Sequence, residues 1–92
     1  MNSIAALAHH PAGTVAALTA TIADVTPRTT AAGAPWAEVT VAEGPHTAHL
    51  IVPPARYPAL HHHLEIGHTA TFTGRVDTRR LLPALVVTHL HP

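Results

Sequence analysis

Five arginines and a single tryptophan are the side chains of this sequence with the clearest capacity to bind a ligand. Arg28 borders one turn-rich segment, and Arg79 and Arg80 lie in another, where the forked guanidinium group suits phosphate oxygens. The ring of Trp36 can stack on a nucleic-acid base, which contributes about 1–3 kcal/mol. The alternatives are solvated loop charge for the arginines and a packing role for Trp36.

Ten histidines raise the question of a metal site. A tetrahedral site needs three or four ligands that converge. His89 and His91 share one strand face, His46 and His49 lie on a hairpin, and residues 61–63 occupy a helix. Because nothing in this spacing makes them converge, we expect no metal ion and no cofactor. Imidazole groups in general take up a proton between about pH 5 and 8, so we expect the chain to become cationic in mild acid.

No group of residues has the spacing of a catalytic site. The chain has no cysteine, its only serine is Ser3, and it has no glycine-rich phosphate loop. The acidic residues are dispersed along the sequence at Asp24, Glu38, Glu43, Glu65 and Asp77. Without a nucleophile beside a base or a pair of carboxylates, we expect no enzymatic activity.

Length and composition limit the remaining classes of protein. With 92 residues the chain suits one domain. A net charge of zero and a charged fraction of 11% exclude a polybasic tail. The absence of cysteine excludes disulfides and thiolate metal sites. No apolar stretch reaches the roughly 20 residues of a membrane span, and the N-terminus does not resemble a signal peptide, so we expect a cytoplasmic protein with no membrane partner.

The first half of the sequence predicts a short helix and three strands. Residues 1–12 form a short helix or arm that begins at Ser3, and the domain proper spans residues 13–92. A strand from Gly13 is followed by a loop at 27–35, a strand at 36–41 and a hairpin strand at 47–52. The residues expected to face the core are Leu18, Ala20, Ile22, Ala37, Val39, Val41, Ala48, Leu50 and Val52. Those expected to face outward include Trp36, Glu38, Thr40, His49 and Ile51.

The second half predicts one helix and two more strands. Between Pro54 and Gly67 the spacing is helical, with Tyr57, Leu60 and Leu64 on one side. A strand follows at 69–77, where Gly74 indicates a bulge or a bend. A last strand covers about 82–90. Five strands with one helix between the third and fourth predict an all-β OB-fold barrel.

An ordered set of motifs from Ile22 to Val76 resembles a known family. The motifs are Thr30 to Gly33, the strand from Glu38 to Glu43, Pro53 to Tyr57, Gly67, and Gly74 to Val76. In order and spacing they resemble the OB-fold nucleic-acid-binding domain found near the C-terminus of bacterial replicative DNA polymerase alpha subunits. Anticodon-binding domains of class II aminoacyl-tRNA synthetases are related.

The resemblance implies roles for particular positions. In the family, an aromatic residue at the position of Glu38 stacks on a base, and a polar residue at the position of His49 hydrogen-bonds to it. A basic residue at the position of Arg28 approaches phosphates or bases. This sequence keeps Arg28 and Tyr57, but it has Glu38 in place of the stacking aromatic and Pro53 in place of a phenylalanine.

We therefore expect a module that binds single-stranded nucleic acid, DNA rather than RNA, weakly and largely without sequence preference, in DNA replication or maintenance. The expected site contains Arg28, Trp36, Glu38, Thr40, His49, Tyr57, Arg79 and Arg80. The alternative is a protein-interaction or oligomerisation module that has lost nucleic-acid binding, which Glu38, Pro53 and an outward Ile51 favour. Salt distinguishes these two functions. It weakens binding to nucleic acid, whereas apolar contacts between proteins tolerate salt or are strengthened by it.

Overall fold

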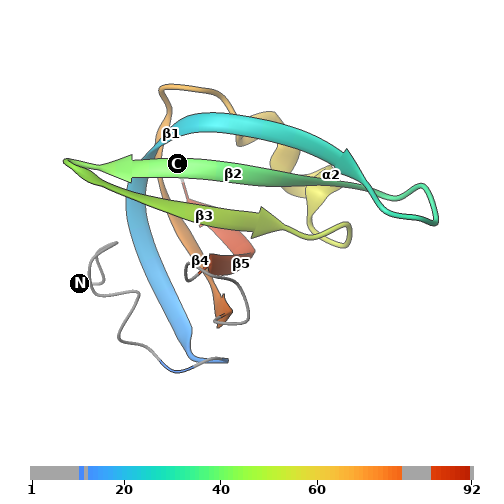
Figure 1. The fold of residues 1–92 in the computed structure, drawn as a ribbon, viewed down its shortest axis with the longest axis horizontal. Helices are drawn as coiled ribbons and strands as arrows, with labels where there is room; N and C mark the ends of the chain where they lie inside the picture. The colour runs from blue at the N-terminus through green and yellow to red at the C-terminus, as the bar shows by residue number, and fades with distance from the viewer. Residues whose placement is uncertain (1–10, 12, 78–83, 92) are drawn as a thin grey trace.

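The computed structural model describes residues 11, 13–77 and 84–91 (Figure 1). Within them the elements are β1 (Val15–Thr29), β2 (Pro35–Glu43), β3 (His46–Val52), α2 (Tyr57–Leu60), the 3₁₀ helix η1 (His61–His63), β4 (Thr69–Asp77) and β5 (Ala84–His91). This order of three strands, a helical segment and two strands confirms the order predicted from the sequence. The short helix expected over residues 1–12 lies outside the described residues, apart from Pro11.

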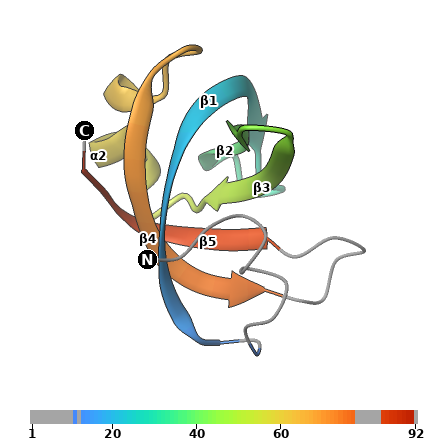
Figure 2. The same ribbon diagram turned by 90° about the vertical axis from the view of Figure 1, so that its left-hand side faces the viewer.

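The strands form a closed barrel in the order β1-β2-β3-β5-β4. β1 is long enough to pair with two neighbours, with β4 over Val15–Thr21 and with β2 over Thr21–Thr29. β5 lies between β3 and β4, as Figure 2 shows, and its pairing with β3 is parallel. A five-stranded barrel with this strand order and a helix between β3 and β4 is the OB-fold, which confirms the predicted fold.

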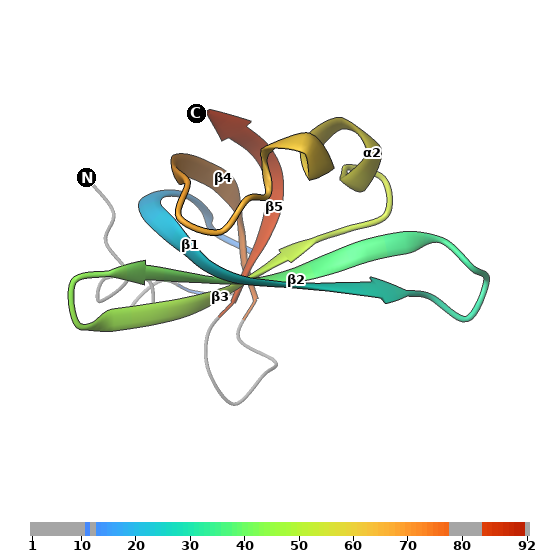
Figure 3. The same ribbon diagram turned by 90° about the horizontal axis from the view of Figure 1, so that it is seen from above.

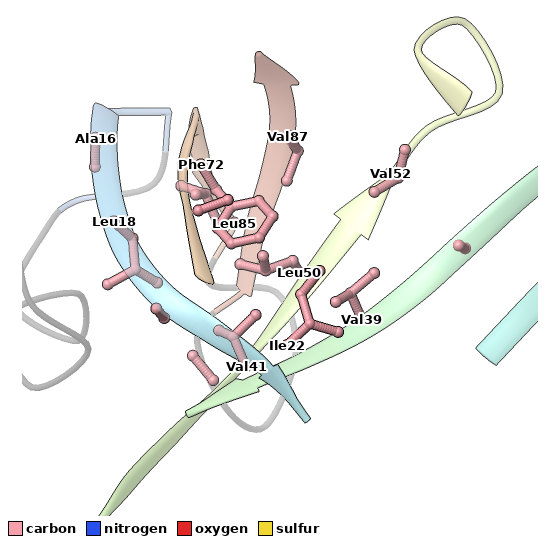
Figure 4. Close-up of a cluster of buried hydrophobic side chains, with 14 of the residues drawn as sticks. Ala16, Leu18, Ile22, Val39, Val41, Leu50, Val52, Phe72, Leu85 and Val87 are labelled. Carbon is pink, nitrogen blue, oxygen red and sulfur yellow. The ribbon is translucent and has the colours of Figure 1, made fainter. Parts of the chain in front are cut away.

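The core is built from one face of each strand. Every residue expected to point inward from the first three strands is buried. Phe72, the only phenylalanine, is fully buried near Leu50 and Leu85, where β3, β4 and β5 meet (Figure 4). Many of the surrounding core positions carry alanine or valine. The one large ring therefore fills much of the space that these small side chains leave.

The loop expected at residues 27–35 is wrong in its first part, because β1 continues through Pro27 to Thr29. Proline lacks an N–H group and is tolerated in a strand only where no partner needs that donor. The second half of β1 pairs with β2 and has no β4 partner beyond Thr21. Pro27 therefore fits there, and the true loop is limited to residues 30–34.

The bulge or bend expected at Gly74 is confirmed as an irregularity in the pairing of β4 with β5. The register of β4 against β5 shifts between Thr73 and Gly74. Gly74 has no side chain to separate the two strands, and a Cβ atom added there would lie 2.7 Å from the carbonyl carbon of Val86. The hydroxyl of Thr88 donates to the Thr73 carbonyl oxygen at 3.2 Å beside this shift.

The helical segment is shorter than predicted. The helices end at His63 instead of continuing to Gly67, because Leu64 leaves the helical conformation at ψ 70°. Tyr57, Leu60 and Leu64 pack against the core, as their spacing predicted. Gly67 adopts φ +91° and its N–H donates to the Ile22 carbonyl at 2.7 Å, which ties the segment to β1. No helix in the described part of the chain has the length and apolarity needed to cross a membrane.

Candidate functional site

The strand registers gather polar and apolar side chains on the outer surface of β1, β2 and β3. Three rows cross these strands: Arg28 beside Trp36; Thr26 beside Glu38 and Ile51; and Asp24 beside Thr40 and His49. We refer to these eight residues as the three-strand face. Each of its β2 residues alternates with a fully buried one, so their side chains point away from the core.

A β-bulge in β1 decides which residues of that strand reach the face. The register against β2 shifts between Ile22 and Asp24. Before the shift the buried residues have even numbers, as Ile22 does; after it, Val25 packs against the core. Because side chains alternate strictly along a strand, an unbroken β1 would turn Arg28 inward. The bulge therefore turns Arg28 to the outer surface.

An ion pair crosses the three-strand face from β1 to β2. The Arg28 Nε lies 3.4 Å from the Glu38 Oε1, and the two side chains are 50% and 28% exposed. Such a partly exposed pair contributes little to stability, about 0–1 kcal/mol. Its effect is local: the positive charge of Arg28 offsets the negative charge of the Glu38 carboxylate in the middle of the face.

Trp36 lies at the start of β2, directly opposite Arg28 on β1. It is partly exposed, whereas Ala37 beside it is fully buried. This end of β2 belongs to a β1–β2 hairpin that projects from the barrel, opposite to the β2–β3 hairpin (Figure 3). The indole is therefore carried outward on the side of the sheet that holds Arg28 and Glu38, where a planar ligand can reach it.

Thr40 and His49 face each other across β2 and β3. Thr40 is partly exposed and His49 is exposed. A hydroxyl group both donates and accepts hydrogen bonds, and a neutral imidazole does the same through its two nitrogens. The pair therefore offers hydrogen bonds to a polar ligand on the surface that carries Trp36.

The structure does not bring all the predicted site residues together. Tyr57 packs against the core from α2, and its ring centroid lies 5.4 Å from that of His61, so it is separate from the three-strand face. Arg79 and Arg80 lie outside the described residues. The Nη1 of Arg75, in β4, donates to the Gly13 carbonyl at 3.1 Å.

Sequence reasoning missed two members of the face, Asp24 and Thr26. Both lie after the bulge in β1. Because a loop is predicted from Pro27, the continuation of β1 and its pairing with β2 there went unrecognised. In the sequence, the apolar residues Val25 and Pro27 alternate with polar neighbours, and this alternation is the signal that the strand continues.

Histidines do not gather into a metal site in the described residues, where no group of three or more histidine, cysteine or acidic side chains is placed to bind an ion. His61 instead packs its ring against Tyr57 and His62. His89 places its Nδ1 3.1 Å from the Thr88 hydroxyl. The histidines of the described residues are thus spread over several elements.

Two solved structures share this fold. The SSB domain of a Synechococcus protein superposes with a TM-score of 0.72 and 21% identity, covering 91% of this chain and all of that one. A small single-stranded DNA-binding protein from Streptomyces coelicolor gives a TM-score of 0.64 and 15% identity, covering 90% of this chain and 95% of that one. No protein-family model and no curated protein sequence matches the chain. These likenesses support the OB-fold independently of the strand order.

Proposed function

We propose that this protein binds single-stranded DNA along its three-strand face. The observation that carries the proposal is the gathering of Arg28, Trp36, Thr40 and His49 on the outer surface of β2 and its neighbours. OB-folds use the surface of strands 2 and 3 for oligonucleotides. One structural neighbour is described as an SSB domain and the other as a single-stranded DNA-binding protein, which favours DNA over RNA.

Each part of the face has a distinct role in this proposal. The Trp36 indole stacks on a base, an interaction that tolerates any sequence because every base has a π-face. Arg28 is half-exposed beside it and binds the phosphate that follows, together with Arg79 and Arg80, which follow β4 in the sequence. Thr40 and His49 hydrogen-bond to base edges. We place Tyr57 in a supporting role, because it packs against the core from α2.

We further propose that the protein acts by binding alone, without catalysis. The face presents hydroxyl, imidazole, indole and guanidinium groups without a cysteine or serine nucleophile. The resemblance to the OB domain of replicative polymerase subunits favours an accessory role in replication or DNA maintenance in the cytoplasm. Protein partners or further copies of the chain are compatible with this role.

The first test is a titration of Trp36 fluorescence with a nine-residue oligo-dT at two salt concentrations. Phosphate contacts release counterions, and contacts from Arg28, Arg79 and Arg80 predict a slope of log K against log salt of about −2. We therefore expect the affinity to fall about 15-fold between 50 and 200 mM salt. A flat titration together with a blank gel shift would contradict the proposal and favour the protein-interaction module.

Acidification is expected to strengthen the same binding. The net charge is zero with histidines neutral, and imidazole groups in general gain a proton within the range of about pH 5 to 8. Each proton adds positive charge to the chain, so the affinity for the polyanionic DNA strand should rise as the pH falls from 7.5 to 6. The titration repeated at both pH values measures this, and equal affinities would rule it out.

A further inference from the structure

We propose that Glu38 makes the three-strand face prefer guanine to thymine, a specificity that rests on the proposed binding of single-stranded DNA. Glu38 stands in the middle of the face, with Thr26 on one side and Ile51 on the other. Its side chain is 28% exposed. A carboxylate at this position repels phosphate, so its presence in a DNA-binding face calls for a ligand group that it attracts.

The chemistry of an ionised carboxylate selects among bases. It accepts hydrogen bonds and donates none. The Watson–Crick edge of an unpaired guanine carries two adjacent donors, N1–H and the 2-amino group, which match the two oxygens of a carboxylate. Thymine has a single N–H between two carbonyl oxygens, and these oxygens repel the carboxylate. Because bases in a single strand expose their Watson–Crick edges to proteins, Glu38 favours guanine.

The spacing on β2 brings a stacked base within reach of this group. Trp36 and Glu38 are two positions apart on the same side of the strand, about 6.8 Å along it. This distance is comparable to the length of a purine. A guanine that stacks on Trp36 can therefore direct its Watson–Crick edge toward Glu38, while the partly exposed Ile51 beside Glu38 offers an apolar surface to the base.

Arg28 makes the carboxylate compatible with a DNA strand. Its Nε lies 3.4 Å from the Glu38 Oε1, so the two charges balance where the phosphates must pass. The guanidinium has five N–H donors, and this contact leaves others for a phosphate. Glu38 keeps the capacity for further hydrogen bonds, because an ionised carboxylate has about four acceptor positions.

The experiment compares three oligonucleotides that differ at their central base. They are nine-residue thymidine strands whose fifth base is thymine, guanine or hypoxanthine, and binding is measured by competition against a labelled oligo-dT. We expect the guanine strand to bind about five- to tenfold more tightly than the thymine strand. This factor lies toward the lower end of the discrimination between right and wrong base that a good bidentate contact provides. Hypoxanthine lacks the 2-amino group and should lose most of this gain.

The variant Glu38→Gln separates base recognition from simple charge. The glutamine amide keeps one acceptor but sets an N–H donor against the donors of guanine, so the preference for guanine over thymine should fall below about twofold. Because the negative charge is gone, the thymine strand should bind the variant more tightly than it binds the unaltered protein. Glu65→Gln, in the exposed turn before β4, is the matched control and should change neither value. Unchanged melting temperatures show that both variants are folded.

The outcomes separate the two proposals. If the unaltered protein binds no strand, the proposed function fails and this specificity fails with it. If it binds all three strands equally, or if Glu38→Gln strengthens binding while the guanine preference persists, only the role of Glu38 is overturned. A guanine preference that disappears in Glu38→Gln and persists in Glu65→Gln supports it.

Discussion

Replacing Gly74 with alanine is expected to lower the free energy of unfolding by about 3 kcal/mol. The added Cβ would meet the Val86 carbonyl group, 2.7 Å from its carbon, and would lie 3.0 Å from the Val87 Cα. Both contacts are to backbone, which cannot rotate away as a side chain can. β4 and β5 must therefore separate at the point where their register shifts. For a domain whose total stability is about 5–15 kcal/mol, this is a large loss.

Urea denaturation of both proteins, followed by far-UV circular dichroism, measures the effect. Thr73→Ala is the matched control, because it changes the neighbouring residue on the partly exposed side of β4 and should cost no more than about 1 kcal/mol. A Gly74→Ala protein as stable as the control would show that β4 and β5 separate easily, contrary to the close approach described above.

Replacing Trp36 with alanine is expected to weaken binding of single-stranded DNA by about 5- to 150-fold, which corresponds to the 1–3 kcal/mol of base stacking. Trp36 lies on the outer side of β2, so the fold should survive its removal. Since the variant loses the intrinsic fluorophore, the measurement is the anisotropy of a labelled oligo-dT.

Trp36→Phe provides the control for this prediction. A phenyl ring retains a stacking surface, so its affinity should lie closer to that of the unaltered protein than to that of Trp36→Ala. If the alanine and phenylalanine variants bind equally well, the aromatic ring at this position does not stack on a base, and Arg28, Arg79 and Arg80 must supply the affinity.

The inward residues of the first three strands could be predicted from the sequence because burial on one face imposes a period of two. Leu18, Val39 and Leu50 are all essentially inaccessible to solvent. The same reasoning gave the outward positions of Trp36, Thr40 and His49, because residues between buried ones must point away from the core.

The bulge in β1 could not be predicted in this way. Ala23 and its neighbours carry no feature that distinguishes an inserted residue from a regular one. The inward-facing positions simply change from even numbers, as at Ile22, to odd numbers, as at Val25. The pairing of β1 with both β4 and β2 imposes the change, and this pairing depends on segments far away in the sequence. The alternation around Val25 indicates that the strand continues, but the register shift that decides which side Asp24 and Thr26 face could be known only from the structure.

The helical segment shows a second limit of sequence reasoning. Its apolar spacing predicted which side chains pack on the core, and Tyr57, Leu60 and Leu64 do so. The end of the helix depends on the conformation of Leu64 and on the bond from Gly67 to the Ile22 carbonyl, which are tertiary features. Likewise, the pairing of Arg28 with Glu38 follows from the register of β1 against β2. The alternation of residues within each strand does not determine this register.

The position of β5 between β3 and β4 has a consequence for how the chain folds. The meander of β1, β2 and β3 is local, whereas pairs such as Thr21 and Thr69 are 48 residues apart. Chains rich in such distant contacts fold in milliseconds to seconds. During synthesis the edges of β3 and β4 stay open until the last strand, Ala84–His91, leaves the ribosome. Open edges pair readily with other chains, so closure by β5 is the step that protects a newly made molecule from aggregation.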